Sequence, residues 1–176
     1  MSAGEAPSAR SRSSGGRRLD PELLADHVGR LYRAAYGLCG SRADAEDLVQ
    51  DTFERVLRRP RFLRREDDLA YLLRVLRNTW VSSGRSRRPV HLPLEDEETG
   101  RIPGDDPVVA QVVEAGAVYE ALRGLTAPLR EAVVAVDVVG LSYRDAARAL
   151  GTKEGTIMSR LHRGRGQIAA QVELEH

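Results

Sequence analysis

The sequence predicts an all-α protein made of two small helical domains joined by a flexible acidic linker. Apolar residues recur at helical spacing on both sides of residues 89–107. That interval itself holds four prolines, two glycines and six acids against a single Arg101. No segment has the clear alternation typical of paired strands. We therefore expect a disordered tail at 1–19, domains at 20–88 and 108–173, and a linker at 89–107.

Composition narrows the classes of function. The 176 residues carry 27 basic and 26 acidic side chains, and the net charge of +1 hides their segregation into separate stretches, so nucleic acid stays a candidate partner. Cys39 is the sole cysteine, which excludes an intrachain disulfide and a multi-thiolate zinc site. No apolar run has the length of a membrane span or a secretory signal. We expect a cytoplasmic chain with no membrane contact of its own, no metal and no cofactor.

The first domain opens with a helix after a tail that has almost nothing to bury. Residues 1–18 are mainly serine, glycine, alanine and arginine, which is typical of disorder. Pro21 suits the first turn of a helix whose apolar residues recur at helical spacing until Gly40.

The second helix is predicted to begin after Ser41, with Asp44 in the capping-box position. Its apolar stripe is Ala45, Leu48, Val49, Phe53, Val56 and Leu57. Most of the remaining face is acidic, and arginines follow at the helix end, where cations complement the dipole. The acidic face is consistent with a plain solvated surface and equally with a docking surface for a basic partner.

An arginine-rich loop and a third helix complete this domain. Residues 58–66, RRPRFLRRE, place five arginines around Phe62 and Leu63, a composition that fits a surface for unstacked bases. The alternative is a loop whose Phe62 packs into the core. The third helix is expected from about Asp68 to Ser83, and its Trp80 is more often a core residue than a ligand contact.

The second domain is predicted to contain a helix from Pro107 to about Gly124, one from Thr126 through Val139, and then a helix-turn-helix. Ser142 caps the first helix of that motif and Thr152 the second. Ala147, Gly151 and Ile157 supply the small residue, turn glycine and buried anchor that two closely joined helices need. An ordinary αα-hairpin with a solvated basic side is the alternative to a reader of duplex DNA.

Three motifs in this order resemble the extracytoplasmic-function (group IV) sigma factors of bacterial RNA polymerase. They are DAEDLVQDTFERVL at 44–57, LAYLLRVLRNTWVSSGRSRR at 69–88, and the segment 121–165 that includes GTIMSRLHR. The resemblance covers roughly residues 20–172. It implies that the domains are sigma region 2 and the helix-turn-helix sigma region 4, and that the chain is not an enzyme.

The resemblance also assigns roles to residues of the first domain. The side chains implied to dock on the clamp helices of the largest polymerase subunit are Asp47, Gln50, Asp51 and Glu54. The residues implied to bind and melt the minus-ten element are Phe62, Leu63, Arg64, Arg74, Arg77, Asn78 and Trp80. Capture of a flipped base would offset the cost of opening the duplex.

In the second domain the resemblance implies contact with the minus-thirty-five element and with the flap of the second-largest subunit. Base-reading positions fall on Met158, Ser159, His162 and Arg163, and phosphate or packing positions on Arg144, Arg148, Thr156 and Arg160. The acidic linker resembles the segment that runs through the polymerase cleft. An anti-sigma factor that covers the same surfaces is a further implied partner.

Some residues depart from the family pattern. Met158 stands where relatives often carry a basic or polar residue, and it cannot make a bidentate contact with guanine. The terminal residues 174–176 resemble the remnant of an expression tag. The alternative function is a stand-alone helix-turn-helix repressor or activator, although no dimerisation segment is evident. A nuclease using Asp44, Asp47 and Asp51 is disfavoured because these carboxylates share an open helix face.

Overall fold

The computed structural model describes residues 17–19, 21–59, 62–63, 68–84 and 107–174, and most of these are helical. The elements of the first domain are β1 (Arg17–Arg18), α1 (Pro21–Ala25), α2 (Val28–Cys39), α3 (Arg42–Arg58), β2 (Phe62–Leu63) and α4 (Asp68–Ser82). Those of the second are α5 (Pro107–Glu114), α6 (Gly116–Gly124), α7 (Ala127–Val133), the π-helix η3 (Val134–Val138), α8 (Tyr143–Leu150) and α9 (Glu154–Leu174). The all-α fold class is confirmed, whereas the expected tail up to residue 16 and the linker at 89–106 lie outside the described residues.

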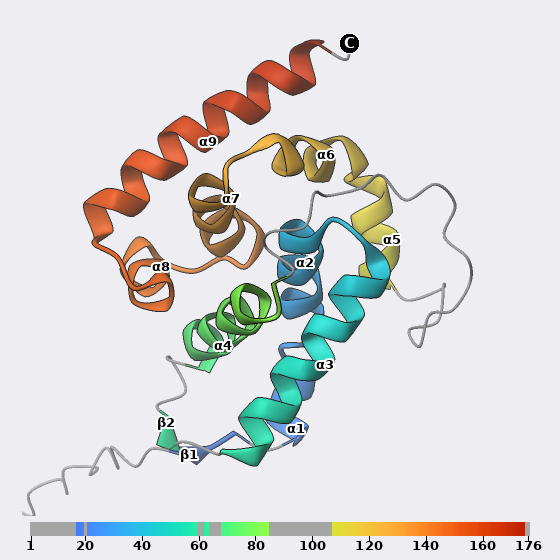
Figure 1. Ribbon diagram of the computed structural model, residues 1–176, viewed down its shortest axis with the longest axis vertical. Helices are drawn as coiled ribbons and strands as arrows, with labels where there is room; N and C mark the ends of the chain where they lie inside the picture. Colours follow the sequence, from blue (N-terminus) through green and yellow to red (C-terminus); the bar gives the residue numbers. More distant parts are fainter. Residues whose placement is uncertain (1–16, 20, 60–61, 64–67, 85–106, 175–176) are drawn as a thin grey trace, which may run out of the picture.

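In the first domain α2, α3 and α4 pack against one another, as their apolar stripes predict (Figure 1). The Oγ of Ser41 accepts a hydrogen bond from the backbone N–H of Asp44 at 3.2 Å, so the predicted cap of α3 is confirmed. Two expectations are wrong. The helix expected from Pro21 to Gly40 is interrupted by a turn at residues 26–27, and Leu57 is 43% exposed instead of buried.

The expectation of no paired strands is also wrong at one small place. Strands β1 and β2 form an antiparallel pair in which Arg17 faces Leu63 and Arg18 faces Phe62. Leu19, next to β1, is only 3% exposed. The predicted disordered tail therefore does not extend to residue 19, because the buried Leu19 and the β1–β2 pairing fix this part of the chain.

The second domain differs from expectation in its first helices. The helix predicted from Pro107 to Gly124 breaks at Ala115 into α5 and α6. Thr126 precedes α7 as predicted, but its side chain makes no capping hydrogen bond. Beyond Val133 the helix widens into η3, where Leu141 N–H reaches the carbonyl of Ala135 at 3.1 Å.

The helix-turn-helix is confirmed at its defining positions. Ser142 caps α8 by accepting from Asp145 N–H at 3.1 Å. Gly151 adopts φ 65°, a left-handed conformation that suits glycine, and its N–H and that of Thr152 both point to Ala147 O. Ile157 is fully buried. Helix α9 begins at Glu154, so Lys153 and not Thr152 immediately precedes it.

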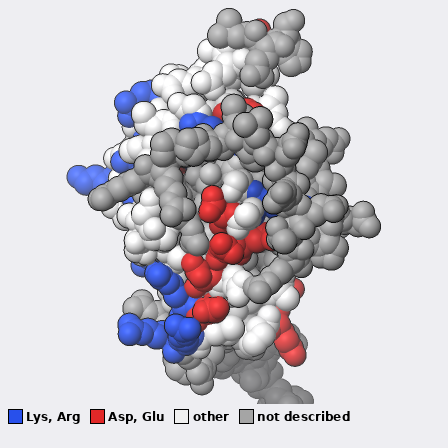
Figure 2. Space-filling model, turned by 45° about the vertical axis from the view of Figure 1, so that its right-hand side comes forward, with Lys and Arg blue, Asp and Glu red and all other residues white. Residues whose placement is uncertain are grey.

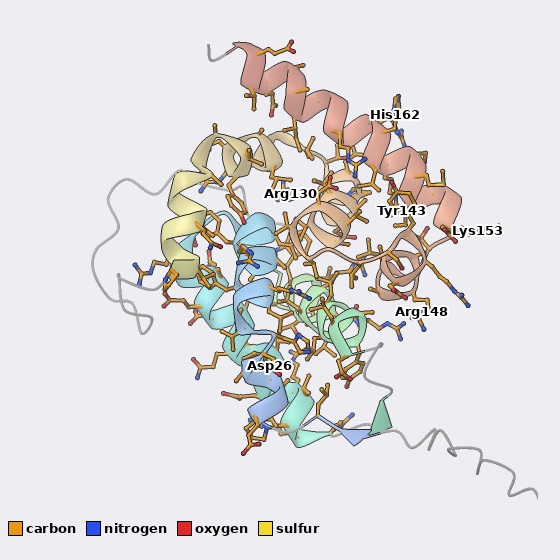
Figure 3. All side chains as sticks on the ribbon, turned by 180° about the vertical axis from the view of Figure 1, so that it is seen from behind. Asp26, Arg130, Tyr143, Arg148, Lys153 and His162 are labelled. Atoms are coloured by element: carbon orange, nitrogen blue, oxygen red, sulfur yellow. The ribbon has the colours of Figure 1, made fainter. Side chains whose placement is uncertain are left out.

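The two domains share one hydrophobic core. Helix α2 contacts α5, α6, α7 and η3, and α4 lies beside α8 (Figure 1). A buried guanidinium fixes part of this contact. Arg130 on α7 is 9% exposed, and Figure 3 shows it deep within the molecule.

Arg130 binds the carbonyls that end two helices. Its Nε donates to Leu122 O at 3.0 Å, and its Nη2 donates to Arg123 O and Leu125 O at 2.9 Å each, at the end of α6. Its Nη1 donates to Leu38 O at 3.2 Å, in the last turn of α2. Helix ends lack intrahelical donors for these carbonyls and carry partial negative charge. Burial lowers the pKa of Arg130, and the four acceptors stabilise its cation.

Replacing Arg130 with methionine keeps an unbranched side chain but leaves these buried carbonyls without their donor. We expect Arg130→Met to lower the free energy of unfolding by about 3 kcal/mol, measured by urea denaturation. The control is Arg30→Met on the exposed side of α2, which we expect to change it by less than about 0.5 kcal/mol. Equal stability of the Arg130 variant and the wild type would contradict the capping role.

Candidate docking and nucleic-acid interfaces

The four predicted docking residues form one stripe on α3. Asp47, Gln50, Asp51 and Glu54 are spaced i, i+3, i+4 and i+7, which places them on one helix face, and we call them the docking stripe. Asp51 is half-buried and the other three are exposed. Figure 2 shows acidic side chains joined in a strip on the face of the molecule that carries α3, with basic side chains at one end. Such a stripe can hold a basic or helical protein surface.

Basic residues at the end of α3 and along α4 surround a cavity of about 520 Å³, the arginine cavity. It is lined by Arg55, Arg58, Arg59, Tyr71, Arg74, Val75 and Asn78. Four guanidinium groups, an aromatic ring and an amide suit a nucleotide with its phosphate, because arginine binds phosphate and a ring supports an unstacked base. Arg58 also pairs with Glu54 at 3.2 Å, so the cavity borders the docking stripe.

The arginine cavity holds two of the predicted minus-ten residues and adds others. Arg74 and Asn78 line it, but Arg55 and Tyr71 were not among the predicted contacts. A signal for Tyr71 was present in the sequence: Tyr71, Arg74 and Asn78 are spaced i, i+3 and i+7, and so share one face of α4.

The remaining minus-ten predictions have different outcomes. Trp80 is 2% exposed within the core, so the structure assigns it to packing and its predicted DNA contact is not possible in this conformation. Arg77 is 30% exposed and pairs with Glu131 of the second domain. The backbone of Phe62 and Leu63 lies in β2, while their side chains and Arg64 lie outside the described residues.

The outer face of α9 carries the predicted base-reading residues. Ile157 and Leu161 pack inward at 0% and 2% exposure, whereas Met158 is 54% exposed. Ser159, His162 and Arg163 are exposed too, and Figure 3 shows His162 pointing away from the molecule. This face can enter a major groove without rearrangement of the helix.

The residues predicted to contact phosphate or to pack inside the domain form an exposed pair and a half-buried pair. Arg144 and Arg148 of α8 are exposed, and Figure 3 shows Arg148 pointing outward on the side of the molecule where Lys153 precedes α9. Thr156 and Arg160 of α9 are half-buried, which favours a packing role.

Charged contacts fix the start of α8. The Ser142 hydroxyl, followed by Arg148, lowers the pKa of the Asp145 carboxyl by hydrogen bonding to its ionised form. The ionised carboxylate therefore holds both the cap and the guanidinium at neutral pH.

A second arginine fixes α9 to its own domain. Arg165 donates to both carboxylate oxygens of Asp137 in η3, with Nε–Oδ2 at 3.0 Å and Nη2–Oδ1 at 2.6 Å. These hydrogen bonds raise the pKa of Arg165. Gly164 lets α9 approach α7 closely, since a Cβ there would lie 2.8 Å from Val133 Cγ2. Helix α9 is thus held against η3 and α7.

Metal binding and membrane insertion are two further possibilities that the described residues bear on. In those ranges no three histidine, cysteine, aspartate or glutamate side chains gather as metal ligands. Within the same part of the chain, no helix combines the length and apolar character that a membrane crossing requires.

Two family profiles match the chain. Residues 23–89 match Sigma-70 region 2, and residues 115–168 match Sigma-70, region 4. The first span contains the docking stripe and the arginine cavity, and the second contains the helix-turn-helix. The predicted domain bounds, 20–88 and 108–173, stay a prediction, and each match overlaps one of them.

Similar proteins are known from several bacteria. The ECF RNA polymerase sigma factor SigM of Mycobacterium tuberculosis is 37% identical over 175 residues, which cover 88% of this chain and 86% of that protein. SigE of Mycolicibacterium smegmatis is 38% identical over 151 residues, covering 84% of this chain but only 59% of that relative. The Bartonella quintana sigma factor RpoE, solved with the anti-sigma factor NepR, has a TM-score of 0.63 at 25% identity and matches 88% of this chain and 97% of its own.

Two arginines on α9 test this geometry as a matched pair. We expect Arg163→Ala to weaken binding to a duplex selected from a randomised library by about tenfold or more, because it removes an exposed contact to DNA. We expect Arg165→Ala to change that affinity by less than about threefold and to cost about 1 kcal/mol of stability, because its guanidinium holds Asp137. Fluorescence anisotropy measures the affinity for the duplex, and urea denaturation measures the free energy of unfolding. Equal loss of affinity in both variants would contradict the assignment.

Proposed function

Because the chain belongs to the extracytoplasmic-function sigma factors of the sigma-70 family, we propose that it binds core RNA polymerase and directs promoter-specific initiation. The observation that carries this proposal is the presence, in one chain, of the docking stripe, the arginine cavity and the helix-turn-helix. A protein that only binds duplex DNA needs the helix-turn-helix. Only a subunit that also joins a polymerase and opens DNA uses all three.

Core binding is proposed to occur through the docking stripe. Its side chains lie along one face of α3 and would meet cationic side chains on the clamp helices of the largest subunit. Complementary charge speeds association and selects orientation. Contact of the second domain with the flap of the second-largest subunit is part of the same proposal.

Promoter recognition is proposed to divide between the domains. Helix α9 would anchor the minus-thirty-five duplex through Ser159, His162 and Arg163, with Met158 limited to apolar contact. The arginine cavity would take an unstacked base of the minus-ten element, with Tyr71 supporting its ring and the arginines holding phosphate. Trapped bases favour the open duplex without nucleotide hydrolysis.

Two further statements belong to this proposal. An anti-sigma factor is an expected partner, since the similar RpoE of Bartonella quintana was solved in complex with the anti-sigma factor NepR. The chain is expected to act in the cytoplasm, beside core polymerase, as a regulatory subunit without catalysis of its own. A stand-alone repressor would leave the docking stripe and the arginine cavity without a use.

Charge reversal tests core docking. We expect Asp51→Arg to weaken binding to purified core polymerase by at least about tenfold, because a cation would face the basic partner surface. Asp26→Arg, an exposed change in the turn between α1 and α2, supplies the same charge change away from the stripe. Analytical gel filtration of each variant with core polymerase measures the effect. Core binding by Asp51→Arg at the strength of the Asp26 control would refute docking through this stripe.

A further inference from the structure

We propose that Met158 selects a thymine of the minus-thirty-five element by apolar contact with its 5-methyl group, at a close approach of α9 that Gly155 permits. The inference rests on the proposed function and names the base that one position of α9 reads. Three observations carry it: the exposure of Met158, the hydrogen bonds of its polar neighbours, and a glycine that the fold does not require.

Met158 is an apolar residue on the face of α9 that carries the predicted base-reading residues. Its side chain is 54% exposed, whereas Ile157 beside it is fully buried. Met158 and His162 are spaced i and i+4, so they share one face of α9, and Figure 3 shows His162 pointing away from the molecule. More than half of the Met158 surface therefore gains apolar contact only when a partner covers this face.

The chemistry of the major groove limits what Met158 can read. A thioether has no hydrogen-bond donor and is a weak acceptor, so it gains little from the polar edges of guanine, adenine or cytosine. Thymine alone among the four bases presents an apolar group in this groove, the methyl on C5. A methionine among the base-reading residues therefore favours thymine at the position that it covers.

The polar neighbours of Met158 suit other groups. The Ser159 hydroxyl donates to the Thr156 carbonyl at 3.0 Å, which leaves its lone pairs to accept from the amino group of adenine or cytosine. The Arg163 Nε donates to the Ser159 carbonyl at 3.4 Å, which leaves its two terminal nitrogens for guanine or phosphate. Of the side chains of Met158, Ser159 and Arg163, only that of Met158 ends in an apolar group.

Gly155 leaves room for close approach on the same face. It lies in the first turn of α9, three residues before Met158. A Cβ at Gly155 would meet nothing within 4 Å and its φ is not positive, whereas a Cβ at Gly164 would lie 2.8 Å from Val133 Cγ2. Glycine weakens a helix, so packing within the fold does not account for Gly155. Close approach of the groove to the backbone does account for it, because this approach brings a base methyl group within reach of Met158.

Removal of one methyl group tests the contact. The full chain selects a duplex from a randomised library, and each thymine of the selected element is then replaced in turn by deoxyuridine, which lacks only the methyl group. We expect one replacement to weaken binding to the wild-type chain by about fourfold in fluorescence anisotropy, the effect of one buried methyl group. In Met158→Ala the same replacement should change the affinity by less than about 1.5-fold.

Two further variants separate this contact from a general loss of binding. Arg163→Ala should bind the duplex more weakly and yet keep the preference of about fourfold for thymine over uracil. Met158→Arg should enrich guanine from the same library at the position where the wild type enriches thymine, because arginine makes a bidentate contact with guanine. Enrichment of thymine at this position by Met158→Arg would contradict the proposal. Circular dichroism confirms that each variant folds.

Gly155→Ala tests the close approach. We expect it to raise the urea midpoint of unfolding, because alanine is the better helix former. We also expect it to weaken the affinity for the selected duplex by about threefold or more, because its Cβ separates α9 from the groove. Gly116→Ala is the matched control at the start of α6, where a Cβ also meets nothing within 4 Å, and it should leave the affinity unchanged.

Three results would overturn the proposal: equal affinity for thymine and uracil at every position, a full set of thymine preferences that persists in Met158→Ala, or a selection that enriches no duplex. Wild-type affinity of Gly155→Ala would overturn the close approach. Transcription with core polymerase keeps these results apart from the proposed function. Chain-dependent initiation without a methyl effect refutes only the Met158 contact, whereas absence of initiation refutes the sigma function whatever the duplex result.

Discussion

The buried Arg130 guanidinium is the constraint on which the arrangement of the surfaces depends. It donates hydrogen bonds to backbone carbonyls at the end of α6 in its own domain and at the end of α2 in the first domain. These hydrogen bonds connect α7 to both helices. Helix α9 packs on α7, while α3 and α4 pack on α2. The Arg130 cation therefore links the helix that supports α9 to the helix that supports α3 and α4, by supplying donors that the helix ends lack.

Opposite charges are placed close together on α3 and serve different partners. The docking stripe ends at Glu54, and Arg58 one turn later lines the arginine cavity while pairing with Glu54. The surface proposed for core polymerase thus adjoins the surface proposed for melted DNA. This proximity suits a subunit that holds single-stranded DNA at the entrance of a polymerase, because both partners must meet on one small domain.

The sequence predicted best what depends on neighbouring residues. Ser41 and Ser142 identified helix starts, and Gly151 with Ile157 identified the helix-turn-helix, because caps and tight turns are local chemistry. Long-range packing was not accessible in this way. The β1–β2 pair consists of two residues per strand, too few for a pattern. For Trp80 the sequence offered both a core position and a DNA contact, and its 2% exposure decides for the core. The arginine cavity likewise forms where α3 lies beside α4, so Arg55 of α3 has no local signal, whereas Tyr71 shares a face of α4 with Arg74 and Asn78.

The central claim is that this chain gives core polymerase its choice of promoter. Run-off transcription on a library of genomic fragments, with purified core polymerase and with or without the wild-type chain, tests it most directly. If the chain is a sigma factor, we expect discrete transcripts that appear only when the chain is added. These transcripts should start downstream of a shared pair of sequence elements. Tight binding to duplex DNA as a dimer, with no chain-dependent transcript from any fragment, would contradict the claim and favour a stand-alone helix-turn-helix regulator.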